Sequence, residues 1–561
     1  MGKIGHLVDA VLRHSWERRL RAACSLMFMF LLLLLVNACQ EDLPDDRQVE
    51  ETLRPTANQS PSPSPAVSDT PIPTTMPTLV PTAEPVLFDA QYEPAECQFS
   101  PSHVSNLSCG YVTVPENRQV ENGRNIRLHV AIASSYAAVP EEEPLIVLSG
   151  GPGSFALEWL YGNLHYYTDI LKKRDVVFFD PRGVGYSEPS LDCPEVSETF
   201  GELLDQPLDQ GELADRLVDA HLSCRERLET ENIDVASYNS TEMAADVDDI
   251  RRSLDYEKIN LLGISYGTRT ALTLMRDYPE ILRGVVLDSP VPLEANLIGA
   301  DAENSDQARQ LLFEHCEADA DCSAKYPKLD EALDSLYRQL EENPVTIPVA
   351  HLGTGDIYQV RVDGSMLGAS ILEALYNSET IVTLPKLIYD SLEGENSDFE
   401  TLATSLEIYL LYGDYSSEGL RYSVLCSDEA SFNTLDSSRA LTETAHPAIS
   451  SYISNDVEMF YRICDGWGAD EAEPIENQAV ISDIPALVLS GELDPVTPPA
   501  WGRQVANNLS NSFFVQFPFS GHSVFAERSC ARDIIGDFLD DPMTEPDSGC
   551  TQSIHLNFIT Y

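Results

Sequence analysis

Basic side chains are scarce in this sequence. Of its 561 residues, 35 are lysine or arginine and 91 are aspartate or glutamate, which gives a formal net charge of −56. Binding to nucleic acid requires clusters of Lys and Arg that neutralise phosphates. The composition therefore argues against a nucleic-acid partner, and the acidic excess is typical of a solvated surface that keeps a protein soluble.

Metal and nucleotide motifs are also missing. The sequence has no HExxH motif and no two cysteines at CxxC spacing, so nothing in it predicts a metal site. Gly183-Val-Gly185 lacks the remainder of a dinucleotide fingerprint. We therefore expect a protein that works without a cofactor.

The longest apolar run near the N-terminus, Leu26–Val36, is too short to span a bilayer comfortably. Five basic residues between Lys3 and Arg21 precede it, an arrangement typical of a signal peptide. The run ends in Val36-Asn37-Ala38-Cys39, which resembles a bacterial lipoprotein signal in which the cysteine is lipidated. We expect a signal peptide over 1–38 and an exported, extracytoplasmic chain anchored to the cell envelope by a lipid on Cys39. An ordinary cleaved signal and an uncleaved anchor helix are the alternatives.

A linker follows over residues 39–86. Nine prolines lie between Pro55 and Pro85, among many serines and threonines. Such a stretch cannot bury enough apolar surface to fold, and it prefers extended conformations. It would hold the folded part away from the membrane.

Ten of the twelve cysteines lie beyond the signal and the predicted lipid site. An even number of cysteines in an exported chain predicts disulfides. The ten fall into five sequential couples, each within one local region. The predicted pairs are Cys97–Cys109, Cys193–Cys224, Cys316–Cys322, Cys426–Cys464 and Cys530–Cys550.

Short apolar runs alternate with helical patterns over 87–290 and again over 481–561. Runs of this length and composition predict the buried strands of a mostly parallel sheet, hence an α/β core in two parts. Over 291–480 the alternation stops, and leucine and tyrosine recur at helical spacing. We expect a mostly helical cap inserted there. The predicted core strands include Leu145–Leu148, Val176–Phe179, Ile259–Ile264, Val285–Leu287, Ala486–Leu489 and Phe513–Phe517.

The strongest chemical signal is Gly263-Ile264-Ser265-Tyr266-Gly267. A GxSxG motif between a strand and a helix forms a sharp turn that exposes its serine at the helix N-terminus. There the helix dipole and free N–H groups favour developing negative charge. Ser265 is therefore the predicted nucleophile of an α/β-hydrolase core.

A serine nucleophile needs a base and an orienting acid, which follow it in that fold in the order acid and then histidine. Asp494 lies in a proline-rich turn just after the run Ala486–Leu489, and His522 follows the last predicted strand. We predict Asp494 as the acid and His522 as the base. Glu492 and His555 are the nearest rivals.

The oxyanion hole needs two backbone donors. We expect one from the N–H of Tyr266 and the other from the glycine-rich loop after Leu145–Leu148, with Gly151 as the candidate. A further motif, Asp180-Pro-Arg-Gly-Val-Gly-Tyr-Ser187, predicts a structural role in which an Asp180–Arg182 pair and glycine turns brace that loop.

Together these motifs resemble the proline iminopeptidase and tripeptidyl aminopeptidase family of α/β-hydrolase serine peptidases. The matching stretches are CGYVTVPENR at 109–118, GGPG at 150–153, DPRGVGYS at 180–187, GISYGTR at 263–269, GELDPVTP at 491–498 and GHSV at 521–524. Ser149 stands where proline iminopeptidases often carry histidine, so the branch that acts on longer peptides is the more similar one.

The resemblance implies a serine exopeptidase that removes tripeptides or N-terminal residues from peptides, with acidic cap residues holding the substrate's ammonium group. Asp428 and Glu429 lie in a stretch similar to the family's Cys-x-Glu/Asp segment, and we expect one of them to bind the peptide amine. A carboxylesterase or another small-acyl hydrolase with the same Ser-Asp-His triad is the alternative, and a non-catalytic binding protein is a third reading. The oligomeric state is left open.

Overall fold

The computed structural model describes residues 88–99 and 106–560, except 205, 207, 209, 352–354, 393–398, 400–401 and 408–415. The predicted signal peptide over 1–38, the lipid site at Cys39 and the linker up to residue 86 lie outside the described residues. Every described residue belongs to one compact unit, Glu84–Tyr561.

A nine-stranded sheet, ordered β1-β2-β3-β5-β4-β6-β7-β10-β11, forms the base of the fold. The first strands pair antiparallel, and from β5 through β11 all neighbours are parallel. The mostly parallel sheet predicted from the sequence is confirmed. The strands are β1 (Tyr92–Ala95), β2 (Leu107–Pro115), β3 (Asn125–Ala133), β4 (Leu145–Leu148), β5 (Val176–Phe179), β6 (Ile259–Ile264), β7 (Leu282–Asp288), β10 (Ala486–Gly491) and β11 (Ser512–Phe517).

Helices cover both faces of this sheet, which explains why the central strands are apolar throughout. Leu261 of β6 packs into one core cluster with α5 and α6, whereas its neighbour Leu262 packs into another with α2 and α19. The alternation follows from the two-residue period of a strand. The helices are α2 (Ala156–Asn163), α5 (Ser240–Ser253), α6 (Gly267–Asp277), α17 (Pro499–Asn508), α18 (Val524–Glu527) and α19 (Ser529–Asp540).

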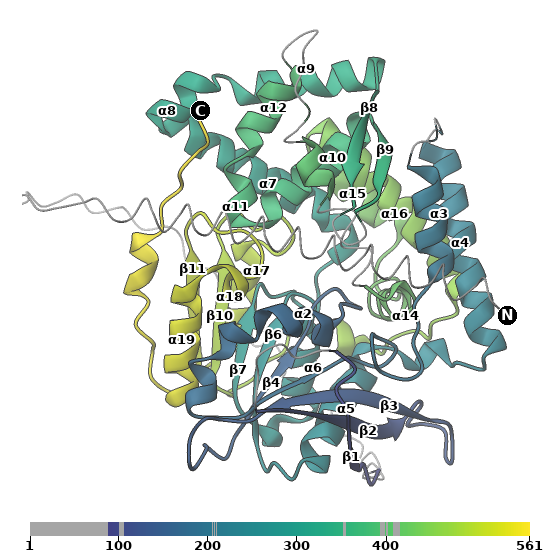
Figure 1. Cartoon of the computed structure of the whole chain (residues 1–561), viewed down its shortest axis with the longest axis vertical. Helices are drawn as coiled ribbons and strands as arrows, with labels where there is room; N and C mark the ends of the chain where they lie inside the picture. The colour runs from purple at the N-terminus through teal and green to yellow at the C-terminus, as the bar shows by residue number, and fades with distance from the viewer. Residues whose placement is uncertain are drawn as a thin grey trace, which may run out of the picture. The chain divides into compact units, whose positions relative to one another are not determined.

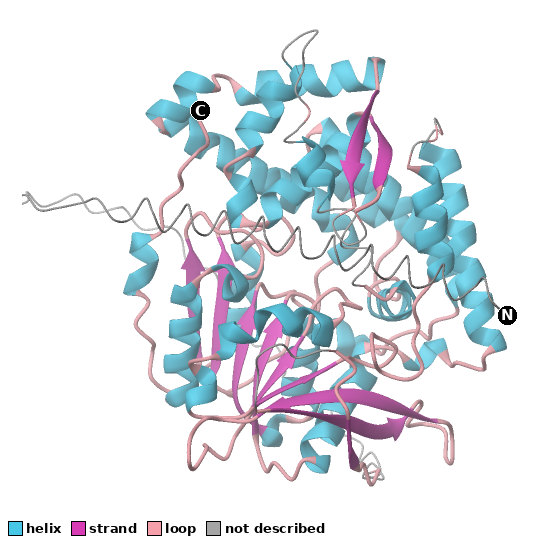
Figure 2. Cartoon of the chain, viewed as in Figure 1, coloured by secondary structure: helices cyan, strands magenta, loops and turns pink. Residues whose placement is uncertain are grey.

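A helical segment occupies the chain between β7 and β10 and fills the upper half of the view in Figure 1. It has an apolar core of its own, together with one small hairpin of β8 (Val345–Ala350) and β9 (Ile357–Val362) that stands out in Figure 2. We call this segment the cap. Its helices are α7 (Leu297–Ala318), α8 (Ala320–Lys325), α9 (Leu329–Glu342), α10 (Gly364–Tyr376), α11 (Ser378–Ile381), α12 (Leu384–Leu392), α14 (Glu418–Asp428), α15 (Leu435–Thr442) and α16 (Pro447–Trp467).

Two helices from the stretch between β5 and β6, α3 (Pro194–Leu203) and α4 (Gln210–Thr230), pack against the cap rather than the sheet. Trp467 of α16 is fully buried in the apolar cluster that joins α4 to α14 and α16. From the sequence we expected this stretch to belong to the α/β core. The structure adds that it supports the cap.

Five disulfides join the same couples that the sequence predicts, Cys97–Cys109, Cys193–Cys224, Cys316–Cys322, Cys426–Cys464 and Cys530–Cys550. Each closes a loop within one local segment. Within residues 88–560, where the structure describes them, no helix combines the length and apolar character needed to cross a membrane.

Candidate active site

Ser265 occupies a tight turn between β6 and α6. Its φ of 55° lies in the left-handed region, which is strained for a residue with a side chain and is often found at functional sites. The flanking glycines are required by close packing: a Cβ on Gly267 would lie 2.2 Å from the carbonyl oxygen of Leu148, and one on Gly263 would lie 2.8 Å from that of Gly267. The motif therefore has the strand, turn and helix that a nucleophile elbow requires.

Asp494 and His522 form a buried hydrogen-bonded pair. The Nδ1 atom of His522 lies 2.9 Å from Oδ2 and 3.1 Å from Oδ1 of Asp494. Because a carboxylate accepts, Nδ1 carries the proton and Nε2 is left with its lone pair. No described residue hydrogen-bonds to Nε2. The imidazole thus has the tautomer that a general base needs.

The surroundings of this pair favour the charged forms of both residues. Burial lowers the pKa of His522, but the neighbouring Asp494 outweighs burial and leaves that pKa raised. Burial raises the pKa of Asp494, but His522 and two hydrogen bonds from Thr497 outweigh it and leave that pKa lowered. The Thr497 N–H and hydroxyl donate to the carboxylate at 2.8 and 2.7 Å and fix its orientation.

The rivals named from the sequence lie elsewhere. The Glu492 carboxylate accepts the N–H of Phe519 at 2.8 Å and makes no hydrogen bond to His522. His555 is exposed in the C-terminal tail. Of the two acids, Asp494 is the one that meets His522, whereas Glu492 lies 3.7 Å from His315.

The GGPG loop lies directly against the nucleophile. A Cβ on Gly150 would lie 2.8 Å from the Cβ of Ser265, so only glycine allows this approach. Gly151 has a φ of 108°, a conformation that again favours glycine. For the N–H groups of Gly151 and Tyr266, no acceptor is found in the described part of the chain. The loop borders a pocket lined by Gly150, Pro152, Met243, Tyr266, Thr270 and Leu420.

Asp180 and Arg182 do not form the ion pair that we predicted. The buried Asp180 carboxylate accepts the N–H groups of Leu157 at 3.0 Å and Tyr186 at 2.9 Å, and burial raises its pKa to about 7. Leu157 lies in the first turn of α2, just after the GGPG loop. The bracing of that loop is therefore present, but backbone amides and not an arginine hold the aspartate.

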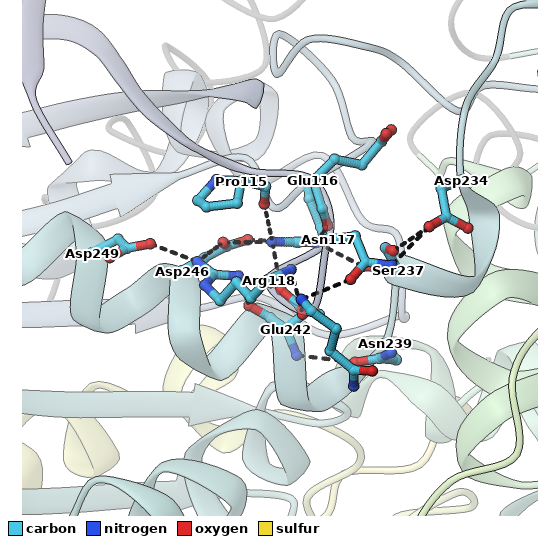
Figure 3. Close-up of polar contacts among 12 residues, drawn as sticks. Pro115, Glu116, Asn117, Arg118, Asp234, Ser237, Asn239, Glu242, Asp246 and Asp249 are labelled. Carbon is cyan, nitrogen blue, oxygen red and sulfur yellow. Dashed lines mark hydrogen bonds and ion pairs between the residues drawn. The ribbon is translucent and has the colours of Figure 1, made fainter. Parts of the chain in front are cut away.

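Arg182 pairs instead with Asp246 of α5. Figure 3 shows Asp246 together with Arg118. Its guanidinium is fully buried, donates to both Asp246 oxygens at 2.8 and 2.7 Å, and donates to the carbonyl oxygens of Glu116 and Ser237 at 2.7 and 2.6 Å. Arg118 also donates to Asp246, at 2.7 Å. Because Arg182 and Asp246 lie 64 positions apart in the sequence, local sequence patterns do not predict this pair.

The two predicted amine ligands have different surroundings. Glu429 is fully buried, pairs with Arg269 and accepts the N–H of Leu297 at 3.0 Å, so its carboxylate is already neutralised. Asp428 accepts the Tyr266 hydroxyl at 2.8 Å and the Ser240 hydroxyl through one oxygen, Oδ2. Its other oxygen, Oδ1, has no hydrogen-bond partner among the described residues.

A third cap acid, Asp301 of α7, was not anticipated. Burial raises its pKa to about 7, while Arg421 lowers it, and it interacts electrostatically with His522 and Asp494. Its Oδ1 atom has no hydrogen-bond partner in the described ranges. A lone aspartate in a helical stretch carries no motif, so sequence reasoning had no signal for it.

The cap also contacts the base directly. The main-chain N–H of His522 donates to the carbonyl oxygen of Tyr376 at 2.8 Å, and the centroids of the two rings lie 4.7 Å apart. Ser378, two residues further on, donates to Glu527 from its N–H at 2.7 Å and accepts the Gly521 N–H at 3.3 Å. The junction of α10 and α11 therefore forms one wall of the histidine loop.

Comparison with known protein families and sequences agrees with this geometry. Residues 143–316 match the α/β hydrolase fold family, and residues 449–550 match the TAP-like protein family. The chain is 24% identical over 464 residues to the serine protease Hip1 of Mycobacterium tuberculosis, covering 78% of this chain and 86% of that protein. It is 32% identical over 195 residues to the tripeptidyl aminopeptidase of Streptomyces lividans, covering 33% and 35%. A thermophilic esterase structure from Thermogutta terrifontis aligns with a TM-score of 0.33 at 14% identity, covering 75% of this chain and 95% of that one.

The parallel sheet, the elbow on β6 and the acid–histidine pair after β10 and β11 define the chain as an α/β hydrolase. Two features narrow that class. The C-terminal part matches the TAP-like family, and a serine protease relative aligns over most of the length of both chains. The chain has the α/β hydrolase fold, and these comparisons support a tripeptidyl-aminopeptidase-like serine peptidase.

Proposed function

We propose that this protein is a serine aminopeptidase that releases tripeptides or single N-terminal residues from peptides through an acyl-enzyme on Ser265. The observation that carries the proposal is the buried Asp494–His522 pair, whose Nε2 has no hydrogen-bond partner among the described residues. The Ser265 elbow and the GGPG loop, which lie against each other, would complete the site with it. The relatives that are serine peptidases support peptide bonds as the substrate.

In the proposed reaction, Ser265 Oγ attacks the scissile carbonyl carbon while His522 Nε2 takes the hydroxyl proton. The N–H groups of Gly151 and Tyr266 stabilise the oxyanion. Asp494 stabilises the imidazolium, which then gives its proton to the leaving amine. Water, deprotonated by His522, hydrolyses the acyl-enzyme and releases the N-terminal fragment.

For the substrate's ammonium group we propose a carboxylate of the cap. Asp428 keeps one free oxygen, and Asp301 lies in the electrostatic surroundings of His522. Neither carboxylate forms a salt bridge within the described part of the chain, and a peptide ammonium would supply one. Glu429 is the weaker candidate because a substrate would have to displace Arg269.

The five disulfides indicate an extracytoplasmic location. We further propose that a lipid on Cys39 anchors the chain to the cell envelope, with residues 39–86 as a tether and residues 291–480 as the cap over the catalytic core. Metabolic labelling with a fatty acid would test the anchor, since Cys39→Ser should abolish incorporation and release the protein from the membrane fraction.

The proposed activity is tested by comparing wild type with Ser265→Ala on three substrates: a tripeptide anilide with a free amine, its N-acetylated form and a short-chain nitrophenyl ester. We expect Ser265-dependent cleavage of the free-amine anilide that is lost on acetylation. Ester cleavage alone would favour the small-acyl hydrolase, and equal cleavage of both anilides would favour an endopeptidase. Asp301→Asn and Asp428→Asn are measured separately. The variant that removes the carboxylate holding the ammonium should have the higher KM for the free-amine substrate.

A further inference from the structure

Asp288, the last residue of β7, is a buried carboxylate to which the proposed mechanism gives no role. Its side chain is fully buried. It has no arginine or lysine partner in the described part of the chain. A buried carboxylate without a cation is costly unless hydrogen bonds compensate for the lost water, so its partners need an explanation.

Those partners lie in the loop that carries the proposed base. The Asp288 carboxylate accepts the N–H of Val524 at 3.2 Å and that of Phe525 at 2.8 Å, two and three residues after His522. The next residue, Ser289, accepts the N–H of Ser523 at 2.9 Å through its hydroxyl. Three consecutive amides after the histidine are therefore held by the end of one strand.

The main chain of Asp288 holds the proposed nucleophile. Its carbonyl oxygen accepts the N–H of Ser265 at 2.9 Å. Ser265 and Ser523 both have a left-handed backbone, at φ of 55° and 64°. One residue thus ties two strained turns together, one bearing the nucleophile and one following the base.

We propose that Asp288 is a positioning residue that fixes His522 relative to Ser265 and places a second carboxylate near the imidazole. This inference rests on the proposed function of Ser265 and His522. The electrostatic effects of Asp288 and His522 on each other agree with this role. Burial raises the pKa of Asp288 to about 7, the two amides and His522 lower it, and Asp288 in turn raises the pKa of His522. The titratable groups facing these two residues are Asp494, Glu527 of α18, Asp301 of α7 and Tyr167 in the 3-10 turn after α2.

Asp288→Asn tests the proposal because it keeps the side-chain shape and one acceptor oxygen but removes the charge. We expect kcat per active site to fall at least tenfold with KM changed less than twofold. The acid limb of the kcat/KM profile should move to lower pH, because the imidazolium loses a nearby negative charge, and it should follow a single ionisation. Active sites are counted by fluorophosphonate labelling of Ser265, and thermal unfolding of the same samples reports the folded fraction.

Ser289→Ala is the matched control, since it removes a hydrogen bond from the same loop without changing the charge. It should lower kcat less than Asp288→Asn and leave the acid limb in place. A pH shift of equal size in both variants, or a kcat for Asp288→Asn that equals wild type per labelled site, would overturn the proposal. If wild type itself is not labelled at Ser265, the proposed function fails instead, which separates the two outcomes.

Discussion

Glu429 forms a buried ion pair with Arg269, and replacing Glu429 shows whether this acid stabilises the fold or binds the substrate. Both side chains are nearly inaccessible, at 2% and 1% exposed, so Glu429→Gln would leave a buried guanidinium without its counter-charge. Breaking a buried pair from one side costs about 3–5 kcal/mol. Glutamine can still accept the Leu297 N–H, so we expect the lower end, about 3 kcal/mol of unfolding free energy. That is a large share of the 5–15 kcal/mol typical of a folded protein.

The assay is urea unfolding of wild type, Glu429→Gln and Glu443→Gln, in parallel with KM for the free-amine anilide. Glu443 is an exposed glutamate of the same cap and should change stability by less than about 0.5 kcal/mol. We expect Glu429→Gln to lose stability with an unchanged KM. A loss below about 1 kcal/mol together with a tenfold rise in KM would refute this reasoning and return Glu429 to the amine site.

Three further predictions concern the loop, the base and an isolated acid. Gly150→Ala should lower kcat at least tenfold while the protein stays folded, because the new methyl group would lie 2.8 Å from the Ser265 Cβ; kinetics with circular dichroism check this. As pH is lowered, kcat/KM should decrease with a midpoint above the ordinary histidine pKa of about 6.5, because Asp494 raises the pKa of His522 and protonation removes the base. A midpoint at or below about 6.5 would contradict the assignment of His522 as the base. Glu373 of α10 is 8% exposed, with a pKa raised by burial to about 7. Its unfolded form ionises first as pH rises, so Glu373→Gln should raise stability above pH 7, on the order of 3 kcal/mol, and change little at pH 4; equal melting shifts at both pH values would argue against this.

Local sequence was sufficient to predict the strands and turns that carry Ser265, Asp494 and His522, because each of these elements lies in one short segment. The elbow around Ser265 needs glycines at fixed positions, and Asp494 and His522 each follow a strand that can be read from its apolar residues. The order of the parallel strands then brings their carboxyl ends together at one edge of the sheet. These elements required no knowledge of distant contacts.

Long-range partners were not predictable in the same way. Arg182 finds Asp246 rather than its near neighbour Asp180, because α5 brings a carboxylate to the buried guanidinium while backbone amides satisfy Asp180. Glu429 meets Arg269 across 160 residues of sequence. The contact of Tyr376 with His522 depends on how the cap packs against the core. Helical periodicity predicts which face of a helix is buried, but it does not predict which element covers that face.

The five disulfides have a consequence for how the protein is made. In sequence order, each of the ten bonded cysteines pairs with the next one that is still free, and no bridge spans or crosses another. A chain that crosses a membrane from its N-terminus therefore presents each cysteine and its correct partner consecutively, at a sequence separation of at most 38. Oxidation in order of arrival would yield these five pairs, so export of such a chain would need an oxidant but no reshuffling of wrong pairs.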